Sequence, residues 1–164
     1  MNAGGEIDLP DSVLERLDIA IASIHMPCFK DERTIDNVTA AYEKVMEHPY
    51  VDIIGHPDDG RFPVDMKRLV KKAKETGTLL EVNNSSLRPE GFRENTKENC
   101  LEMVKECKAQ GVMIVLGSDS HVDADIAEYP YAEEILRETD FPEELVANVS
   151  MEKLKACIKH GKKL

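Results

Sequence analysis

The sequence has no tryptophan, no long apolar run and no surplus of positive charge. A segment that crosses a membrane needs about 18 or more consecutive apolar residues, so we expect no membrane partner. The first residues lack the basic segment followed by an apolar one that marks a signal peptide, and we therefore expect a cytoplasmic protein. The net charge of −11 argues against nucleic acid as a partner, because a negatively charged protein repels the phosphate backbone.

Several sequence motifs that would indicate a chemistry are also absent. None of the four cysteines (Cys28, Cys100, Cys107 and Cys157) belongs to a Cys-x-x-Cys pair, so we expect reduced, mostly packed thiols rather than a zinc or redox site. There is no serine nucleophile elbow, no Walker loop and no Rossmann glycine fingerprint. These absences argue against serine hydrolases, P-loop proteins and dinucleotide-binding enzymes.

Apolar, strand-like runs alternate with helical patterns along the chain. The predicted strands are residues 17–25, 51–57, 78–83 and 112–116, and the predicted helices are residues 34–46, 64–75, 96–109, 132–137 and 151–159. Strands that alternate with helices form βαβ units and a parallel sheet. The almost continuous apolar runs predict that both faces of this sheet are covered. The expected fold class is therefore α/β.

Capping residues mark the ends of two predicted helices. We expect Asp65 in the first turn of helix 64–75 and Gly77 just after its end. For helix 96–109 we expect Asn95 and Glu98 to form a capping pair, and Gly111 to end the helix.

Potential metal ligands follow three of the four predicted strands. The candidates are His25, His56, Asp119 and His121. The carboxyl ends of parallel strands meet at one rim, where α/β proteins bind their ligands. A lone histidine at a strand end is more often structural than a ligand, so the prediction depends on the four together. Imidazole with carboxylate suits zinc, manganese or iron.

Other polar residues near the same rim are candidates for binding substrate. After the third strand the chain carries Asn83, Asn84 and Ser85, which either line a pocket or form a polar turn that satisfies its own backbone. The rim loops also carry Arg61, Arg88 and Arg93, which either grip a phosphate in bidentate fashion or are ordinary surface arginines.

Three further residues have less specific interpretations. Glu81 lies inside a predicted strand, so its side chain needs a partner or a pocket. His48 precedes a strand at the opposite rim, and His160 stands near the basic C-terminal residues, where it can favour the C-terminal dipole of a helix. We expect both histidines to be structural.

Around the predicted strand ends, the chain resembles the PHP (polymerase and histidinol phosphatase) superfamily, and within it the YcdX-like phosphatase branch. The segments that carry the resemblance are residues 5–8, 21–25, 53–57, 80–86, 98–100, 116–121 and 148–150. The resemblance implies a distorted (β/α)7 TIM-like barrel with a multinuclear metal site that hydrolyses phosphoesters. It implies zinc or manganese, with iron as a further option. It also implies that His25, His56, Asp119 and His121 are metal ligands, with Asp119 and His121 catalytic.

The chain departs from this family at its beginning. Members start with a His-x-His strand followed by further histidines and a glutamate ligand, and these motifs are absent here. We therefore expect residues 1–164 to be a single domain that corresponds to the C-terminal part of a PHP domain, without its N-terminal strands. Four strands cannot close a barrel, so we expect exposed sheet edges and an open apolar face. Self-association or the missing N-terminal half would cover that face.

The sequence thus favours a metal-dependent phosphatase that hydrolyses a phosphorylated small molecule by metal-activated water, with activity reduced in this chain alone. One alternative is a non-catalytic subunit or binding module with the PHP fold. A second is a PHP-type exonuclease or proofreading domain, against which the acidic balance argues.

Overall fold

The computed structural model describes residues 1–159 and confirms the predicted α/β class. Its sheet is parallel and has the order β1-β2-β3-β4. The strands are β1 (Ile21–Ala22), β2 (Ile53–Ile54), β3 (Leu79–Asn83) and β4 (Ile114–Gly117). Each strand lies beside the next one in the chain, as consecutive right-handed βαβ units require.

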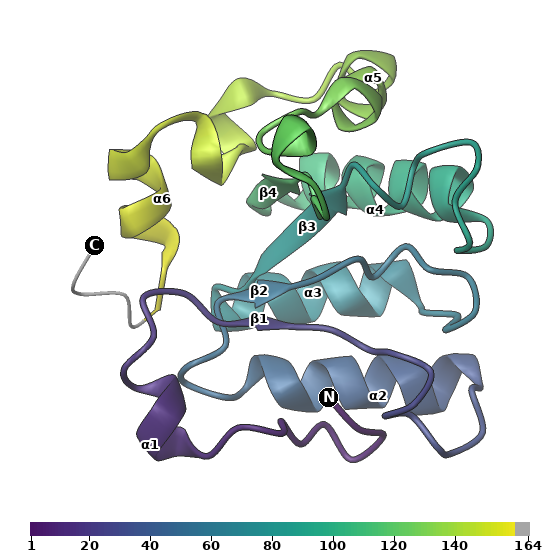
Figure 1. The fold of residues 1–164 in the computed structure, drawn as a ribbon, viewed down its shortest axis with the longest axis vertical. Helices are drawn as coiled ribbons and strands as arrows, with labels where there is room; N and C mark the ends of the chain where they lie inside the picture. The colour runs from purple at the N-terminus through teal and green to yellow at the C-terminus, as the bar shows by residue number, and fades with distance from the viewer. Residues whose placement is uncertain (160–164) are drawn as a thin grey trace.

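Helices follow every strand. They are α1 (Asp11–Leu14), α2 (Ile35–Met46), α3 (Met66–Thr76), α4 (Thr96–Gln110), α5 (Pro130–Glu138) and α6 (Met151–Cys157), with short 3-10 turns η1 (Asp123–Asp125), η2 (Glu143–Leu145) and η3 (Ala147–Val149). Figure 1 shows α2, α3 and α4 in a row with α5 beyond α4, whereas α1 and α6 lie at the left-hand side. The loops that follow the strands lie toward the right.

The two faces of the sheet are covered to different extents. Alternate strand residues such as Leu80 and Val82 join the large core against the helices. On the other face, Leu79 and Val115 belong to a small cluster that Leu154 of α6 partly covers. Ile21, at the far end of that face, is 58% exposed. The expected open apolar face is therefore present, but the C-terminal segment shields part of it.

The outer edge of β4 is not left open, which corrects the expectation of exposed edges at both ends of the sheet. Val146 forms a parallel bridge with Ile114. The carboxamide of Asn148 accepts a hydrogen bond from the N–H of Leu116 (3.0 Å) and donates one to its carbonyl (2.9 Å). An amide side chain thus takes the place of a neighbouring strand and satisfies edge groups that would otherwise need another partner.

The strands β1 and β2 are much shorter than predicted. Residues 17–25 and 51–57 are mostly apolar. However, only two residues from each of these segments form backbone pairs with the neighbouring strand. At the start of β1 the N–H of Ala20 donates to the side chain of Asp52 (3.0 Å), not to a strand. At the end of β2 the backbone of His56 turns into the left-handed region, with φ +34°. A run of apolar residues cannot reveal where such local interactions end a strand.

The observed helix ends agree only in part with those predicted from the sequence. Asp65 is the residue before α3 and caps it by accepting from the N–H of Arg68 (3.1 Å), so it is not in the first turn. Gly77 and Gly111 end α3 and α4 with positive φ, as expected. The predicted capping pair at Asn95 is wrong, because Asn95 has φ +50° and its side chain makes no capping bond.

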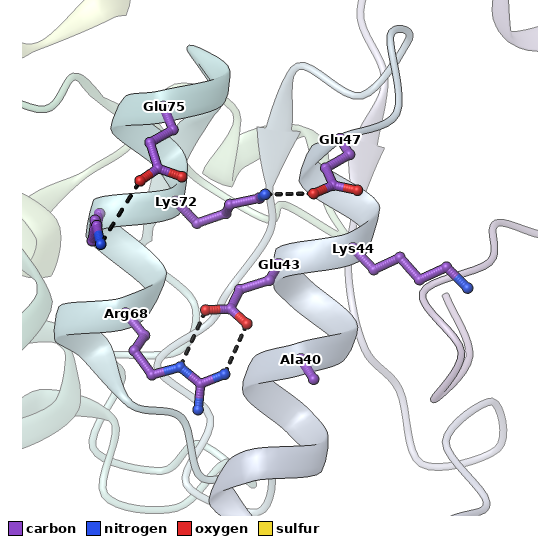
Figure 2. Close-up of a pocket in the computed structure, with 8 residues that line it drawn as sticks. Ala40, Glu43, Lys44, Glu47, Arg68, Lys72 and Glu75 are labelled. Carbon is purple, nitrogen blue, oxygen red and sulfur yellow. Dashed lines mark hydrogen bonds and ion pairs between the residues drawn. The ribbon is translucent and has the colours of Figure 1, made fainter.

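Ion pairs join the outer surfaces of α2 and α3 (Figure 2). Arg68 donates to both carboxylate oxygens of Glu43 (3.1 and 2.8 Å), and Lys72 pairs with Glu47 (2.5 Å). These pairs line a hollow on the helical surface. The acidic and basic groups alternate there and neutralise one another, so we interpret these ion pairs as contacts between α2 and α3 and not as a binding site. Exposed pairs of this kind contribute little to the free energy of unfolding.

The remaining sequence predictions concern thiols, membranes and the C-terminus. Cys100 and Cys107 are buried in α4, and burial raises the pKa of both thiols, that of Cys107 to about 12. No helix within residues 1–159 combines the length and apolar character that crossing a membrane requires. The last helix ends at Cys157, two residues earlier than predicted, and His160 lies outside the described residues.

The two N-cap positions give a paired test. Replacing Asp65 by alanine should lower the free energy of unfolding by about 1 kcal/mol, because the N–H of Arg68 loses its acceptor. Replacing Asn95 by glycine should change it by only a few tenths, since glycine tolerates positive φ and no capping bond is lost. Urea denaturation measures both values. Equal losses in the two variants would contradict the assigned caps.

Candidate functional site

Two histidines meet where the carboxyl ends of β1 and β2 lie side by side. The Nε2 atoms of His25 and His56 are 3.3 Å apart, and their rings are 5.0 Å apart in an edge-to-face arrangement. Two nitrogens that bind one tetrahedral zinc ion at its usual bond length lie about 3.3–3.4 Å apart. The pair therefore has the spacing of two ligands of one ion.

The protonation state of this pair also suits a metal ligand. Burial, with help from the nearby Arg93, lowers the pKa of His56 to about 4. Burial likewise lowers the pKa of His25. Both imidazoles are consequently neutral at pH 7, and neutral imidazole is the form that binds a metal ion.

Asp119 stands beside the histidines and is ionised. Its Oδ2 accepts hydrogen bonds from Asn83 (3.2 Å) and Arg93 (3.1 Å), whereas Oδ1 accepts none from residues 1–159. Burial alone would raise the pKa of Asp119, but these two hydrogen bonds together with the positive charge of Arg93 hold the pKa below its usual value. The carboxylate thus has one oxygen anchored and the other available.

The four candidate ligands are not gathered into one group. His121 is exposed, and its Nδ1 lies 3.0 Å from the backbone carbonyl of Asp119. Across residues 1–159, no three His, Cys, Asp or Glu side chains are arranged to hold a metal ion. The described residues therefore match only part of a metal site. His25 and His56 have the spacing of two ligands of one ion, but Asp119 and His121 are not positioned to bind the same ion with them.

The backbone is strained at two of these positions. His56 has φ +34° and Asp119 has φ +49°, a region that residues with a β-carbon seldom adopt. Such strain costs on the order of 1 kcal/mol or more and persists only where the surroundings enforce it. The strain at these two strand ends is consistent with side chains held for a function.

Glu81 connects the strand ends that carry these residues. Its buried Oε2 accepts from the N–H of His56 (2.7 Å) and from the side chain of Asn83 (3.1 Å). Burial raises its pKa, although both hydrogen bonds act in the opposite direction. A β-carbon on Gly117 would lie 1.8 Å from its Oε1, so only glycine leaves room for the carboxylate there. The sequence-based expectation that Glu81 needs a partner is confirmed.

The polar residues after β3 have different environments. Asn83 is buried, and its Oδ1 accepts from the N–H of Ser86 (2.8 Å). The carboxamide oxygen of Asn84 accepts from the N–H groups of Tyr131 (2.9 Å) and Ala132 (3.1 Å) at the start of α5, which gives Asn84 a structural role. Ser85 lines a hollow formed by the loop that leads to α4.

Arg93 is the cation at the centre of the rim. Its side chain is only 7% exposed and lies between Asp119 and Asp59, with Nη1 donating to the hydroxyl of Ser86 (2.8 Å). Arg61 pairs with the same Asp59 through Nε (2.9 Å) and Nη2 (2.5 Å). Sequence reasoning included both arginines but missed Asp59, which the acidic pair after the His56 turn could have suggested.

Asp58 was also missed and is the most unusual acid of the chain. It is fully buried. Burial raises its pKa to about 7, although the positive charge of Arg93 and the nearby Ser86 hydroxyl act in the opposite direction.

Together, the fold and the rim define an α/β protein whose imidazole, carboxylate and guanidinium side chains converge at the carboxyl ends of parallel strands. Ligands and substrates bind at this position in parallel α/β folds.

Comparison with known proteins identifies the relatives of the chain. It is 46% identical over 160 residues, 98% of its length, to a probable phosphatase of Clostridium novyi. It is 42% identical over 158 residues to a probable phosphatase of Acetivibrio thermocellus, and 36% identical over 164 residues to one of Clostridium acetobutylicum. No protein-family model matches the chain. The chain spans 64%, 64% and 66% of these three relatives and is a partial-length homologue of proteins named probable phosphatases.

The contact between Glu81 and Gly117 can be tested by a double-mutant cycle. Replacing Gly117 by alanine should lower the free energy of unfolding by about 3 kcal/mol, because the new methyl group overlaps the Glu81 carboxylate. In a Glu81→Ala background the same replacement should cost at least about 1 kcal/mol less. Chemical denaturation of the four proteins gives the coupling, and additive costs would show that the two residues do not meet.

The buried Asp58 predicts a pH dependence of stability. Its folded pKa of about 7 exceeds the usual value near 4, so the folded chain holds a proton that the unfolded chain has released. This group's contribution to stability is therefore present at low pH and lost as the pH rises through 7.

Between pH 5 and pH 8, Asp58→Asn should become more stable relative to the wild type by on the order of 2 kcal/mol. Denaturation at both pH values measures the difference. A difference between the two proteins that stays constant with pH would contradict the assignment.

Proposed function

We propose that the chain forms part of the active site of a metal-dependent phosphatase of the PHP type, which hydrolyses phosphate monoesters. The observation that carries the proposal is the pair of neutral imidazoles, His25 and His56, whose Nε2 atoms lie 3.3 Å apart beside the ionised Asp119. The naming of the relatives as probable phosphatases supports the reaction class.

In this proposal His25, His56, Asp119 and His121 would hold the divalent ion, with zinc or manganese preferred and iron as a further option. A bound ion of this kind would lower the pKa of a water molecule and so provide hydroxide near neutral pH. Asp119 has Oδ1 free to accept a hydrogen bond from the attacking water while Asn83 and Arg93 hold Oδ2. His121 is exposed beside Asp119, and because its Nδ1 lies against the Asp119 carbonyl, its Nε2 would be the ligand atom.

The substrate in this proposal is a phosphorylated small molecule. Arg61 and Ser85 are partly accessible at the rim and supply a guanidinium and a hydroxyl for the phosphoryl oxygens. Asn83 holds the carboxylate of Asp119 through a hydrogen bond. Asn84 contributes indirectly, because its side chain fixes the start of α5. The open sheet face near Ile21 is covered by self-association or by a segment of a longer chain.

A second candidate function is a non-catalytic binding module. It is favoured by the ion pair between Arg93 and Asp119, which engages a carboxylate that the first proposal assigns to a metal ion. In that case Arg93 would permanently neutralise Asp119. An exonuclease role has no comparable support, because the net charge of −11 opposes binding of a polyanion.

Metal content decides between the first two candidates. We expect protein purified without chelator to carry at least about one zinc, manganese or iron ion per chain by elemental mass spectrometry. The double variant His56→Ala, Asp119→Asn should lose it, and Asp119→Asn alone should reduce metal-dependent hydrolysis of an aryl phosphate at least ~100-fold.

A matched control is His48→Ala, since His48 lies at the opposite rim and contacts Asp11. This variant should keep its metal and its activity. Equal metal content in the wild type and the double variant would refute the proposed ligands, and a metal-free, inactive wild type would favour the binding module.

A further inference from the structure

An exposed phenylalanine lies directly beside the candidate site. Phe92 is in the loop between β3 and α4 and is 73% exposed. Its ring centroid is 4.9 Å from the guanidinium carbon of Arg61 and 5.3 Å from that of Arg93. Both distances are within the range of cation–π contacts, so two cations position the ring.

The same two arginines are bound to the carboxylates of the site. Arg61 pairs with Asp59, and Arg93 pairs with Asp119. The Nε of Arg93 is buried and has no hydrogen-bond partner among residues 1–159. The aromatic ring is thus connected to Asp119 through a single side chain, which places it next to the proposed reaction centre and next to positive charge.

A hollow adjoins the ring. Its lining residues are Ser85, Arg88, Glu90, Gly91, Phe92 and Arg93, and its volume is about 280 Å³. A cavity of about 150 Å³ is sufficient for a benzene molecule, so this one has room for a single aromatic ring. Val122 and Ile126, in the loop after β4, are also exposed. Arg88 links that loop to the hollow by pairing with Asp125 (2.6 Å).

We propose that Phe92 and this hollow form a subsite for the aromatic leaving group of the phosphate ester, with the more exposed Arg61 facing its phosphoryl group. The inference rests on the proposed phosphatase function and narrows its substrates to esters of planar, aromatic alcohols. An aromatic ring packs favourably against the exposed ring of Phe92, whereas the Arg61 guanidinium complements the negative charge of the phosphoryl group.

Binding of non-hydrolysable phosphonates tests the subsite without requiring catalysis. In NMR titrations of the full chain, phenylphosphonate should bind about tenfold more tightly than methylphosphonate, because only the phenyl group reaches Phe92. Phe92→Ala should reduce this preference to about twofold or less, and Phe92→Leu should give an intermediate value. Arg61→Lys should weaken both ligands to a similar extent.

The control is Leu9→Ala, which removes an exposed apolar side chain beside α1, away from the rim, and should keep the tenfold preference. Circular dichroism of each variant confirms that it remains folded. Equal binding of the two phosphonates by the wild type, or a preference that survives in Phe92→Ala, would overturn the subsite. Selective phosphonate binding by a chain that carries no metal and does not hydrolyse phenyl phosphate would instead uphold the subsite and refute the metal-dependent phosphatase proposal.

Discussion

The buried carboxylate of Glu81 is the interaction on which the arrangement of the rim depends. It lies in the middle of β3, on the sheet face that α2, α3 and α4 do not cover, and it accepts hydrogen bonds from the backbone of His56 and the side chain of Asn83. Burial of an unpaired carboxylate would cost several kcal/mol, and the two donors offset that cost. Gly117 leaves the space that the carboxylate occupies. One side chain thus relates the ends of β2, β3 and β4.

From Glu81 the contacts continue as a series of hydrogen bonds and ion pairs. The amide of Asn83 joins Glu81 to Asp119, and Arg93 joins Asp119 to Asp59, which in turn holds Arg61. From Asp119 onward opposite charges alternate, which allows several ionised groups to lie close together at low exposure.

The sequence predicted the α/β class and the order of strands and helices along the chain, because these follow from the periodicity of apolar residues. It could not predict the short β1 and β2, which end where Asp52 and His56 make local interactions. It also missed the covering of β4 by Asn148, since a side chain that replaces a strand has no sequence period.

At the site, the expectation that His25 and His56 share one rim followed from their positions at strand ends, whereas the central position of Arg93 could not be predicted in this way. Arg93 lies in a loop, and loop conformation depends on tertiary contacts with Asp59, Ser86 and Asp119. The burial of Asp58 was missed for the same reason. Residues on strands were therefore placed more accurately than residues on loops.

X-ray absorption spectroscopy of the zinc-loaded chain tests directly whether the rim binds a divalent ion through His25 and His56. We predict at least two imidazole nitrogens at about 2.0–2.1 Å from zinc, with one of them lost in His25→Ala. A coordination shell of cysteine sulfur, or one without imidazole, would contradict it.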